Sequence, residues 1–165
     1  MAQTHIGENQ VNTNGDLPAI GSDAPDFTLA GNDLKDVPLK QFIGKNVVLN
    51  IFPSVDTRVC AMSVREFNKR ASSLTDTVVL CISKDLPFAM RRFCGAEGID
   101  KVVTLSDFRN MEFTKLYGVE MIDGSMRGLM ARAIVVIDKT GKVKYTELVP
   151  VIGHEPNYDA ALGAV

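Results

Sequence analysis

Apolar residues in this chain gather in short runs that alternate with helical patterns and turn residues. Residues 47–51 and 77–83 are apolar almost without interruption, which is typical of strands buried on both faces of a sheet. Three further strands are predicted, at 102–105, 132–137 and 142–149. The last two are expected to form a hairpin, because the turn sequence Asp-Lys-Thr-Gly separates them.

Helices are expected between these strands. The helix-forming segments are 61–71, 87–94, 110–117 and the tail from Tyr158, with a single helical turn at 39–44. Pro87 suits the first turn of its helix, where an N–H group would have no partner. Gly95 and Gly118 are predicted to end the second and third helices, since glycine adopts the left-handed conformation of a helix end without strain.

Alternating strands and helices that finish in a hairpin predict an α/β fold, in which helices flank a central mixed β-sheet. The polar segment 1–20 contains an Asn14-Gly15 turn signal and is expected to form a short N-terminal β-hairpin. A chain of 165 residues is long enough for one domain with a substantial core. Residues 1–165 are therefore expected to form a single domain, with 1–20 as an extension.

Composition and charge restrict the possible binding partners and the cellular compartment. Hydrophobic residues make up 45% and charged residues 23%, as in ordinary soluble proteins, and the net charge of −2 argues against nucleic acid or an anionic membrane as the main partner. No apolar run approaches the roughly 20 residues of a membrane span. The first residues lack the basic and apolar regions of a secretory signal, so the cytoplasm is expected. Three cysteines in a reducing compartment are more often catalytic or buried than bridged.

Cys60 is the residue whose position points most directly to chemistry. It follows a buried strand and precedes a helix, so it lies near the first turn of that helix. Free N–H groups and the positive end of the helix dipole stabilise an anion there, and the anionic thiolate is the nucleophilic form of cysteine. A free cysteine is, however, commonly a small buried hydrophobic residue. Position alone therefore leaves both interpretations open.

The residues before Cys60 favour the chemical interpretation. Pro53, Thr57 and Cys60 form the pattern Pro-x-x-x-Thr-x-x-Cys, which resembles the active-site motif of the peroxiredoxins. The blocks PSVDTRVC, VVLCIS and RFCGAEG resemble the atypical two-cysteine peroxiredoxins of the bacterial thiol peroxidase type, and the similarity covers about residues 20–162. The resemblance implies a thioredoxin-like fold. It also implies a thiol-specific peroxidase of antioxidant defence that reduces hydrogen peroxide and organic hydroperoxides to water and alcohols.

The resemblance assigns different roles to the three cysteines. Cys60 matches the peroxidatic cysteine, whose thiolate attacks the peroxide and becomes a sulfenic acid. Cys94 matches the resolving cysteine, which condenses with that sulfenic acid into an intrachain disulfide; from the sequence alone it would be a helix residue packed against the sheet. Cys81 lies inside a buried strand and is interpreted as structural. Two cysteines on separate helices are expected to need local unwinding before they can pair.

Four neighbours complete the expected site. One helical turn separates Thr57 from Cys60, so its hydroxyl is expected beside the sulfur, although threonine also suits the helix N-cap. Pro53 would shape the loop and shield the sulfur, or simply end the strand. Arg132 matches an arginine that approaches the peroxidatic sulfur, whereas the sequence alone favours a solvated strand end. Arg58 is interpreted as a solvated charge.

The resemblance also implies partners. Thioredoxin is expected to reset the disulfide, and a homodimer is expected, with its interface near the active site. Apolar residues that would line the mouth of the site favour organic hydroperoxides, although simple packing explains them equally well. These residues are Met62, Phe93, Met126, Leu129 and Met130.

Other kinds of site have little support. His5 and His154 have no ligand at metal-binding spacing, and no nucleotide-binding glycine motif occurs, so neither a metal nor a cofactor is expected. The chain also lacks the C-x-x-C motif of disulfide reductases. Two alternatives to a peroxidase remain open: a redox-responsive binding protein with Cys60 as sensor, and an inert thioredoxin-like domain. Turnover distinguishes them, because a sensor consumes about one peroxide per chain and a peroxidase many.

Overall fold

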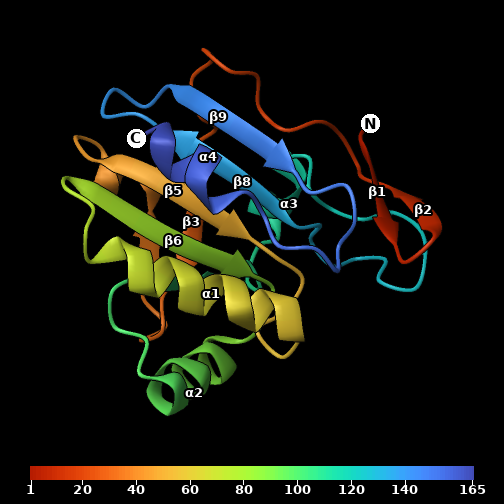
Figure 1. Ribbon diagram of the computed structural model, residues 1–165, viewed down its shortest axis with the longest axis horizontal. Helices are drawn as coiled ribbons and strands as arrows, with labels where there is room; N and C mark the ends of the chain where they lie inside the picture. The colour runs from red at the N-terminus through yellow and green to blue at the C-terminus, as the bar shows by residue number, and fades with distance from the viewer.

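A seven-stranded mixed sheet forms the centre of the computed structural model, which describes residues 1–165 (Figure 1). Its strand order is β4-β3-β7-β6-β5-β8-β9. The strands are β3 (Thr28–Ala30), β4 (Asp36–Pro38), β5 (Asn46–Ile51), β6 (Thr77–Ser83), β7 (Val103–Ser106), β8 (Ala133–Ile137) and β9 (Val143–Leu148). The helices are the 3-10 turn η1 (Leu39–Phe42), α1 (Arg58–Ala71), α2 (Pro87–Glu97), α3 (Glu112–Leu116) and α4 (Tyr158–Gly163). The predicted α/β fold with a central mixed sheet is confirmed.

β5 is an interior strand of this sheet, and its carboxyl end leads to the Cys60 loop. It pairs in parallel with β6 and antiparallel with β8, with Ile51 opposite both Ile82 and Ala133. Neighbours on both edges and packing on both faces explain why the apolar runs of β5 and β6 do not alternate with polar residues. The predicted hairpin of β8 and β9 is also confirmed.

The two faces of the sheet carry separate hydrophobic clusters. α1 and α4 cover the face to which Val48, Val79 and Ile134 contribute, and α2 adds Phe93 at its edge. η1 and α3 cover the opposite face, where Phe113 stacks on Tyr117 with ring centroids 4.4 Å apart. In Figure 1, α1 and α4 lie in front of the sheet and α3 behind it.

The N-terminal hairpin forms, but not around the predicted turn. β1 (Gln3–Ile6) pairs with β2 (Asn9–Asn12) across Gly7 and Glu8, and Gly7 supplies the positive φ of +62°. Asn14 instead accepts from the backbone N–H of Glu120 through its side chain, at 3.0 Å. The turn propensity of Asn-Gly is therefore overridden by a tertiary contact.

The hairpin packs against the loop that follows β9. The buried Thr4 hydroxyl donates to the Val149 carbonyl at 2.8 Å. The His5 N–H donates to the Pro150 carbonyl, and the His5 carbonyl accepts from the Ile152 N–H, both at 2.9 Å. β1 therefore fixes the backbone around Ile152.

Three boundaries of the α-helices differ from the prediction by two residues or more. α2 continues through Gly95 to Glu97, because Gly98 rather than Gly95 adopts the left-handed conformation, with φ of +66°. The Ile99 N–H then closes the helix on the carbonyl of Cys94. α3 begins only at Glu112, since Met111 has a positive φ of +58°. α1 begins at Arg58, three residues before the predicted start at 61.

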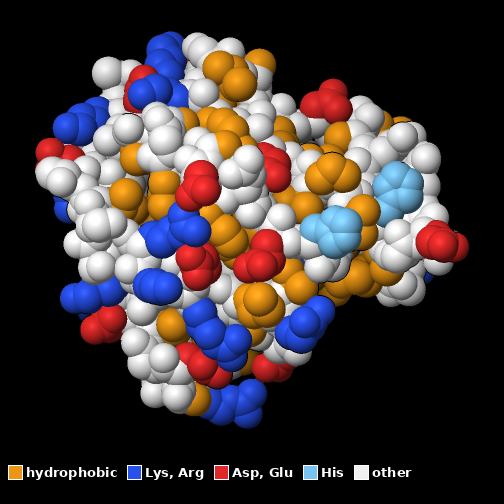
Figure 2. Space-filling view, viewed as in Figure 1, with side chains coloured by type: hydrophobic (Ala, Val, Ile, Leu, Met, Phe, Trp, Pro, Cys, Tyr) orange, Lys and Arg blue, Asp and Glu red, His pale blue; other side chains and the backbone are white.

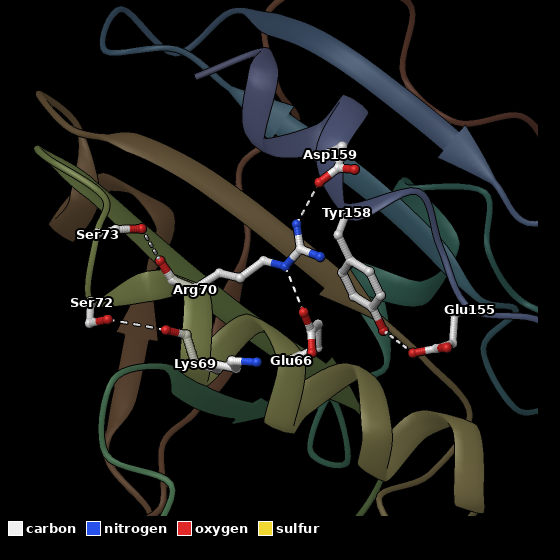
Figure 3. A network of polar contacts seen from close by, with 8 residues as sticks. All are labelled: Glu66, Lys69, Arg70, Ser72, Ser73, Glu155, Tyr158 and Asp159. Carbon is white, nitrogen blue, oxygen red and sulfur yellow. Dashed lines mark hydrogen bonds and ion pairs between the residues drawn. The ribbon is translucent and has the colours of Figure 1, made fainter.

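A polar network fixes the C-terminal half of α1 to α4 (Figure 3). Arg70 donates to Glu66 on its own helix at 2.7 Å and to Asp159 on α4 at 2.6 Å. Its guanidinium also lies 5.2 Å from the centre of the Tyr158 ring, close enough for a cation–π contact. Burial raises the pKa of Tyr158, so its hydroxyl stays protonated and donates to Glu155. α1 is therefore fixed at the end opposite Cys60.

None of the helices combines the length and the apolar character that crossing a membrane would require. On the face shown in Figure 2, basic and acidic side chains are interspersed. Arg65 and Glu97 form an ion pair that joins α1 to α2 through two hydrogen bonds of 2.9 Å.

Candidate active site

Cys60 lies in the first turn of α1, as predicted, but it is not exposed. After β5, the chain passes through the buried Pro53 and turns at residues 54–57, where the Thr57 N–H donates to the Ser54 carbonyl at 3.2 Å. The Cys60 side chain has 0% exposure. The position at a strand-to-helix junction predicted an exposed thiolate, and this prediction is wrong, because Phe52, Val55 and Val64 pack around this turn in the same cluster as Cys60.

Arg132 directly contacts the Cys60 sulfur. Its Nη2 donates to Cys60 Sγ at 3.3 Å, and its Nε donates to the Ile152 carbonyl at 2.9 Å. The arginine is only 1% exposed, so the solvated strand end favoured by the sequence alone is wrong. It precedes β8, and the pairing of Ala133 with Ile51 brings this end of β8 beside the Cys60 loop.

One donor of the buried Arg132 guanidinium has no partner. Nη1 makes no hydrogen bond within the protein, although it is fully buried. An unpaired buried donor costs free energy, typically about 1–3 kcal/mol. Unpaired buried groups are rare in native proteins, and a catalytic role is one explanation for them.

Thr57 occupies the N-cap position of α1, but its side chain does not cap the helix. Its hydroxyl donates to the Ser54 carbonyl at 2.9 Å. The structure therefore gives this hydroxyl a backbone partner in its own turn, and no hydrogen bond joins it to the sulfur. Because the proton is directed to Ser54, the lone pairs of the oxygen remain available as acceptors.

A cavity of about 210 Å³ opens beside this group. Three of the expected site residues, Pro53, Thr57 and Arg132, line this cavity, whereas Cys60 does not. The other lining residues are Arg58, Val59, Met126, Ile152 and Gly153. Arg58 is exposed, in agreement with its interpretation as a solvated charge. The cavity thus combines two arginines and a threonine with apolar walls.

The apolar residues expected at the mouth are only partly there. Met126 lines the cavity, and Phe93 lines a neighbouring one of about 440 Å³ between α1 and α2. Met130 instead lies in the core below α3, and Leu129 packs beside the N-terminal hairpin. Met62 is half-buried on α1 and lines neither cavity.

Cys94 lies on α2 and faces β7 rather than Cys60. Its thiol is half-buried and lies 3.7 Å from the Thr104 hydroxyl. That hydroxyl donates to Asn32, so the contact fits a thiol that donates to Thr104. Burial raises the pKa of Cys94, and the hydrogen bonds to Thr104 and Asn32 only partly oppose this effect. Cys94 is therefore held as a neutral thiol.

Cys81 is fully buried in β6, as interpreted from the sequence. Burial raises the pKa of its thiol to about 12, so it carries no charge near neutral pH. The Asn50 amide donates to Cys81 Sγ at 3.6 Å and to Ser63 Oγ at 3.2 Å. Ser63 in turn donates to the Cys60 carbonyl at 2.8 Å, so this buried network supports the first turn of α1.

Sequence reasoning missed three contributors to this geometry. The Ile152 carbonyl orients Arg132, but a backbone group leaves no sequence signal. Asn50 was detectable as the one amide inside an apolar strand. Asp85 accepts two hydrogen bonds from the loop before Cys60, and its position just beyond the carboxyl end of β6 was the available signal.

Comparisons with known proteins identify the family of this chain. The Redoxin family model matches residues 19–162. Thiol peroxidases of Mycobacterium tuberculosis and Mycobacterium bovis are 59% identical to this chain over 165 residues, covering 100% of it and 99% of each relative. A crystal structure of a peroxiredoxin-like protein from Aquifex aeolicus superposes with a TM-score of 0.93 at 36% identity, over 99% of this chain and 95% of its own.

A thiol peroxidase from Chromobacterium violaceum shares the fold, with a TM-score of 0.89 at 24% identity over 96% of this chain and 91% of its own. The Redoxin match covers most of the chain, and the mycobacterial relatives match over its full length. The chain therefore belongs to the Redoxin family, within which it is a peroxiredoxin of the thiol peroxidase type.

Proposed function

We propose that this chain reduces hydroperoxides through Cys60, with Cys94 as the resolving cysteine and thioredoxin as the reductant. It acts as one domain over residues 1–165, of which the 1–20 hairpin is an extension. The observation that carries the proposal is the contact of Arg132 Nη2 with Cys60 Sγ, with Nη1 of the same group left unpaired. A guanidinium against a buried sulfur stabilises the thiolate that attacks peroxides.

The first step uses the groups around Cys60. The thiolate attacks the terminal peroxide oxygen, the O–O bond breaks, and the sulfur keeps that oxygen as a sulfenic acid. The other oxygen leaves with a proton as an alcohol or as water. Arg132 Nη1 is placed to donate to the developing oxyanion, and the free lone pairs of the Thr57 oxygen suit the peroxide O–H.

Substrate choice follows from the cavity beside Arg132. Its walls include Pro53, Val59, Met126 and Ile152, which offer apolar surface to an organic substituent. We therefore include organic hydroperoxides as well as hydrogen peroxide among the substrates. Catalysis through sulfur alone requires no metal or other cofactor.

The second step requires both cysteine segments to move. Cys94 attacks the sulfenic sulfur, a disulfide forms, and the sulfenic oxygen leaves as water. In the folded site, Cys60 contacts Arg132 and Cys94 contacts Thr104, so each sulfur has another partner. Opening of α2 also removes the burial that raises the pKa of Cys94, which increases its reactive thiolate fraction.

The disulfide must then be reset by an external dithiol, which fits a reducing compartment such as the cytoplasm. Thioredoxin is the reductant in this proposal, and a homodimer is its assembly. Exposed apolar side chains at the start of α2, Leu86 and Phe88, are available for such contacts. Sedimentation at several protein concentrations tests the dimer.

NADPH consumption tests the proposed cycle. The assay contains thioredoxin, thioredoxin reductase and cumene hydroperoxide, and many turnovers per chain are expected, with a Cys60–Cys94 disulfide detectable by peptide mass spectrometry after acid quenching. Consumption of a single equivalent without turnover would instead indicate a sensor. Turnover with another dithiol but not with thioredoxin would contradict the assignment of thioredoxin as the reductant and leave the rest of the proposed cycle intact.

Replacement of Cys81 should leave this cycle intact. Cys81→Ser is expected to keep peroxide turnover within about twofold of the wild type, because the neutral buried thiol does not take part. The free energy of unfolding should fall by about 1–3 kcal/mol, since a hydroxyl replaces a thiol in an apolar site. The coupled assay and urea unfolding measure the two effects. Loss of most activity in a folded variant would contradict the structural interpretation.

A further inference from the structure

Asp85 lies at the junction of the two cysteine-bearing segments. It follows β6 and directly precedes Leu86, the N-cap residue of α2. Its N–H donates to the Ser83 hydroxyl at 3.1 Å, and its carbonyl accepts from the Ser106 hydroxyl. The backbone of Asp85 is therefore attached to the ends of β6 and β7.

The Asp85 carboxylate reaches from this junction to the loop before Cys60. Oδ1 accepts from the Ser54 hydroxyl at 2.7 Å, and Oδ2 accepts from the Val55 N–H at 2.8 Å. Oδ2 also accepts from the Ser83 hydroxyl at 2.6 Å, which orients the carboxylate from the sheet side. Two of the three hydrogen bonds of the carboxylate thus hold the loop, and the third attaches the carboxylate to β6.

The held loop is the one that carries the expected peroxide contacts. The Ser54 carbonyl accepts hydrogen bonds from both the hydroxyl and the N–H of Thr57. Thr57 directly precedes the first residue of α1. Hydrogen bonds to a carboxylate are stronger than those between neutral groups. The Asp85 carboxylate therefore favours the closed arrangement, in which Cys60 is buried against Arg132.

We propose that Asp85 is a positioning residue that keeps the Cys60 loop closed, and that it thereby sets how often the Cys60 sulfenic acid meets a second hydroperoxide before it meets Cys94. The inference rests on the proposed function, because it requires Cys94 to be the resolving partner. In the closed loop the sulfenic acid stays beside the Arg132 cavity. In the opened loop it is accessible to Cys94.

The two fates of the sulfenic acid are separate reactions. A second hydroperoxide transfers one oxygen to the sulfur, giving a sulfinic acid and one molecule of alcohol or water, and this oxidation is not reversed by thiols. The Cys94 thiol instead displaces the sulfenic oxygen as water and gives the disulfide. Loop opening favours only the second reaction, so the fraction of sulfinic acid formed per turnover reports on the loop.

Removal of the carboxylate should shift this partition toward the disulfide. Asp85→Ala is expected to lower the fraction of sulfinic acid per turnover about fivefold or more, because the loop opens more often. Ser54→Ala removes one of the two hydrogen bonds between the loop and Asp85, and it should shift the partition in the same direction by a smaller amount. Ser83→Ala removes hydrogen bonds that hold Asp85 on the sheet side but keeps both bonds to the loop, so it should shift the partition less than either of the other variants.

The experiment exposes each variant to rising cumene hydroperoxide with thioredoxin and its reductase, and measures sulfinic acid at Cys60 by mass spectrometry against NADPH consumed. A lower yield in Asp85→Ala and Ser54→Ala, with the smallest decrease in Ser83→Ala, supports the inference. Equal yields in all four proteins overturn it while leaving the proposed function intact. Absence of a Cys60–Cys94 disulfide in the wild type overturns both.

Discussion

Cys94→Ser is expected to consume about one equivalent of hydroperoxide per chain and then stop, whereas Cys60→Ser is expected to consume essentially none. The difference arises because Cys60 Sγ is the sulfur that contacts Arg132, while Cys94 contacts Thr104 on β7. A serine at position 60 cannot provide a thiolate. A serine at position 94 leaves the first step intact but cannot form a disulfide.

Peroxide remaining after mixing at low molar ratios measures both variants directly, and a sulfenic-acid trap followed by mass spectrometry locates the oxidised residue. Cys81→Ser is the matched control, because it also removes one thiol but should keep turnover. Sustained turnover by Cys94→Ser with thioredoxin would contradict the intrachain disulfide. A dimer on a non-reducing gel would show a disulfide between two chains and would also contradict the intrachain disulfide.

The sheet was predictable because its signals are local and strong. The run at 77–83 matches β6 in full, and the run at 47–51 misses only the first residue of β5. Both strands have neighbours on each edge and clusters on each face, so apolar residues are required at nearly every position. The mixed α/β architecture followed from the alternation of such strands with helices.

Element ends were less predictable, because more than one residue offered the same local signal. Gly95 and Gly98 both suit a helix end, and only tertiary structure selected Gly98. At Gly95 the surroundings leave room for a side chain, so this residue is simply an exposed position in α2. Likewise Asn14-Gly15 and Gly7 both suit a turn, and the register of β1 with β2 selected Gly7.

The site shows the same division between local and long-range information. The strand-to-helix junction around Cys60 is a local signal, and it predicted correctly that Cys60 lies near the start of α1. The burial of Arg132 depends on the pairing of β8 with β5 and on the Ile152 carbonyl, which the hairpin residue His5 fixes. Contacts between residues so distant in the chain leave no pattern that sequence spacing detects.

Arg132→Met is expected to slow the reaction of Cys60 with hydroperoxide about 10²–10³-fold, the usual effect of losing one donor to a developing oxyanion. Methionine fills a similar volume without charge, so the core beside Ile152 should remain packed. Rapid-quench measurement of Cys60 oxidation at several peroxide concentrations gives the rate constant without involving thioredoxin. Thermal unfolding of the same variant separates this effect from a general loss of structure.

Two further variants separate the charge of Arg132 from its geometry. Arg132→Lys keeps the positive charge but loses the planar guanidinium, which donates to the Ile152 carbonyl and to Cys60 Sγ at the same time. A rate between those of the wild type and Arg132→Met is therefore expected. Arg58→Ala removes an exposed arginine from the same cavity and should change the rate only slightly, because solvent screens that charge.

The arginine and the cysteine explain each other's burial. A buried guanidinium without an anion is costly, and so is a buried thiolate without a cation. Nη2 of Arg132 contacts Cys60 Sγ, and Nη1 remains free, which suits the peroxide oxygen of the proposed reaction. A rate constant for Arg132→Met equal to that of the wild type would show that this pair maintains the fold rather than promotes the chemistry, and a loss shared equally by Arg58→Ala would point to long-range charge.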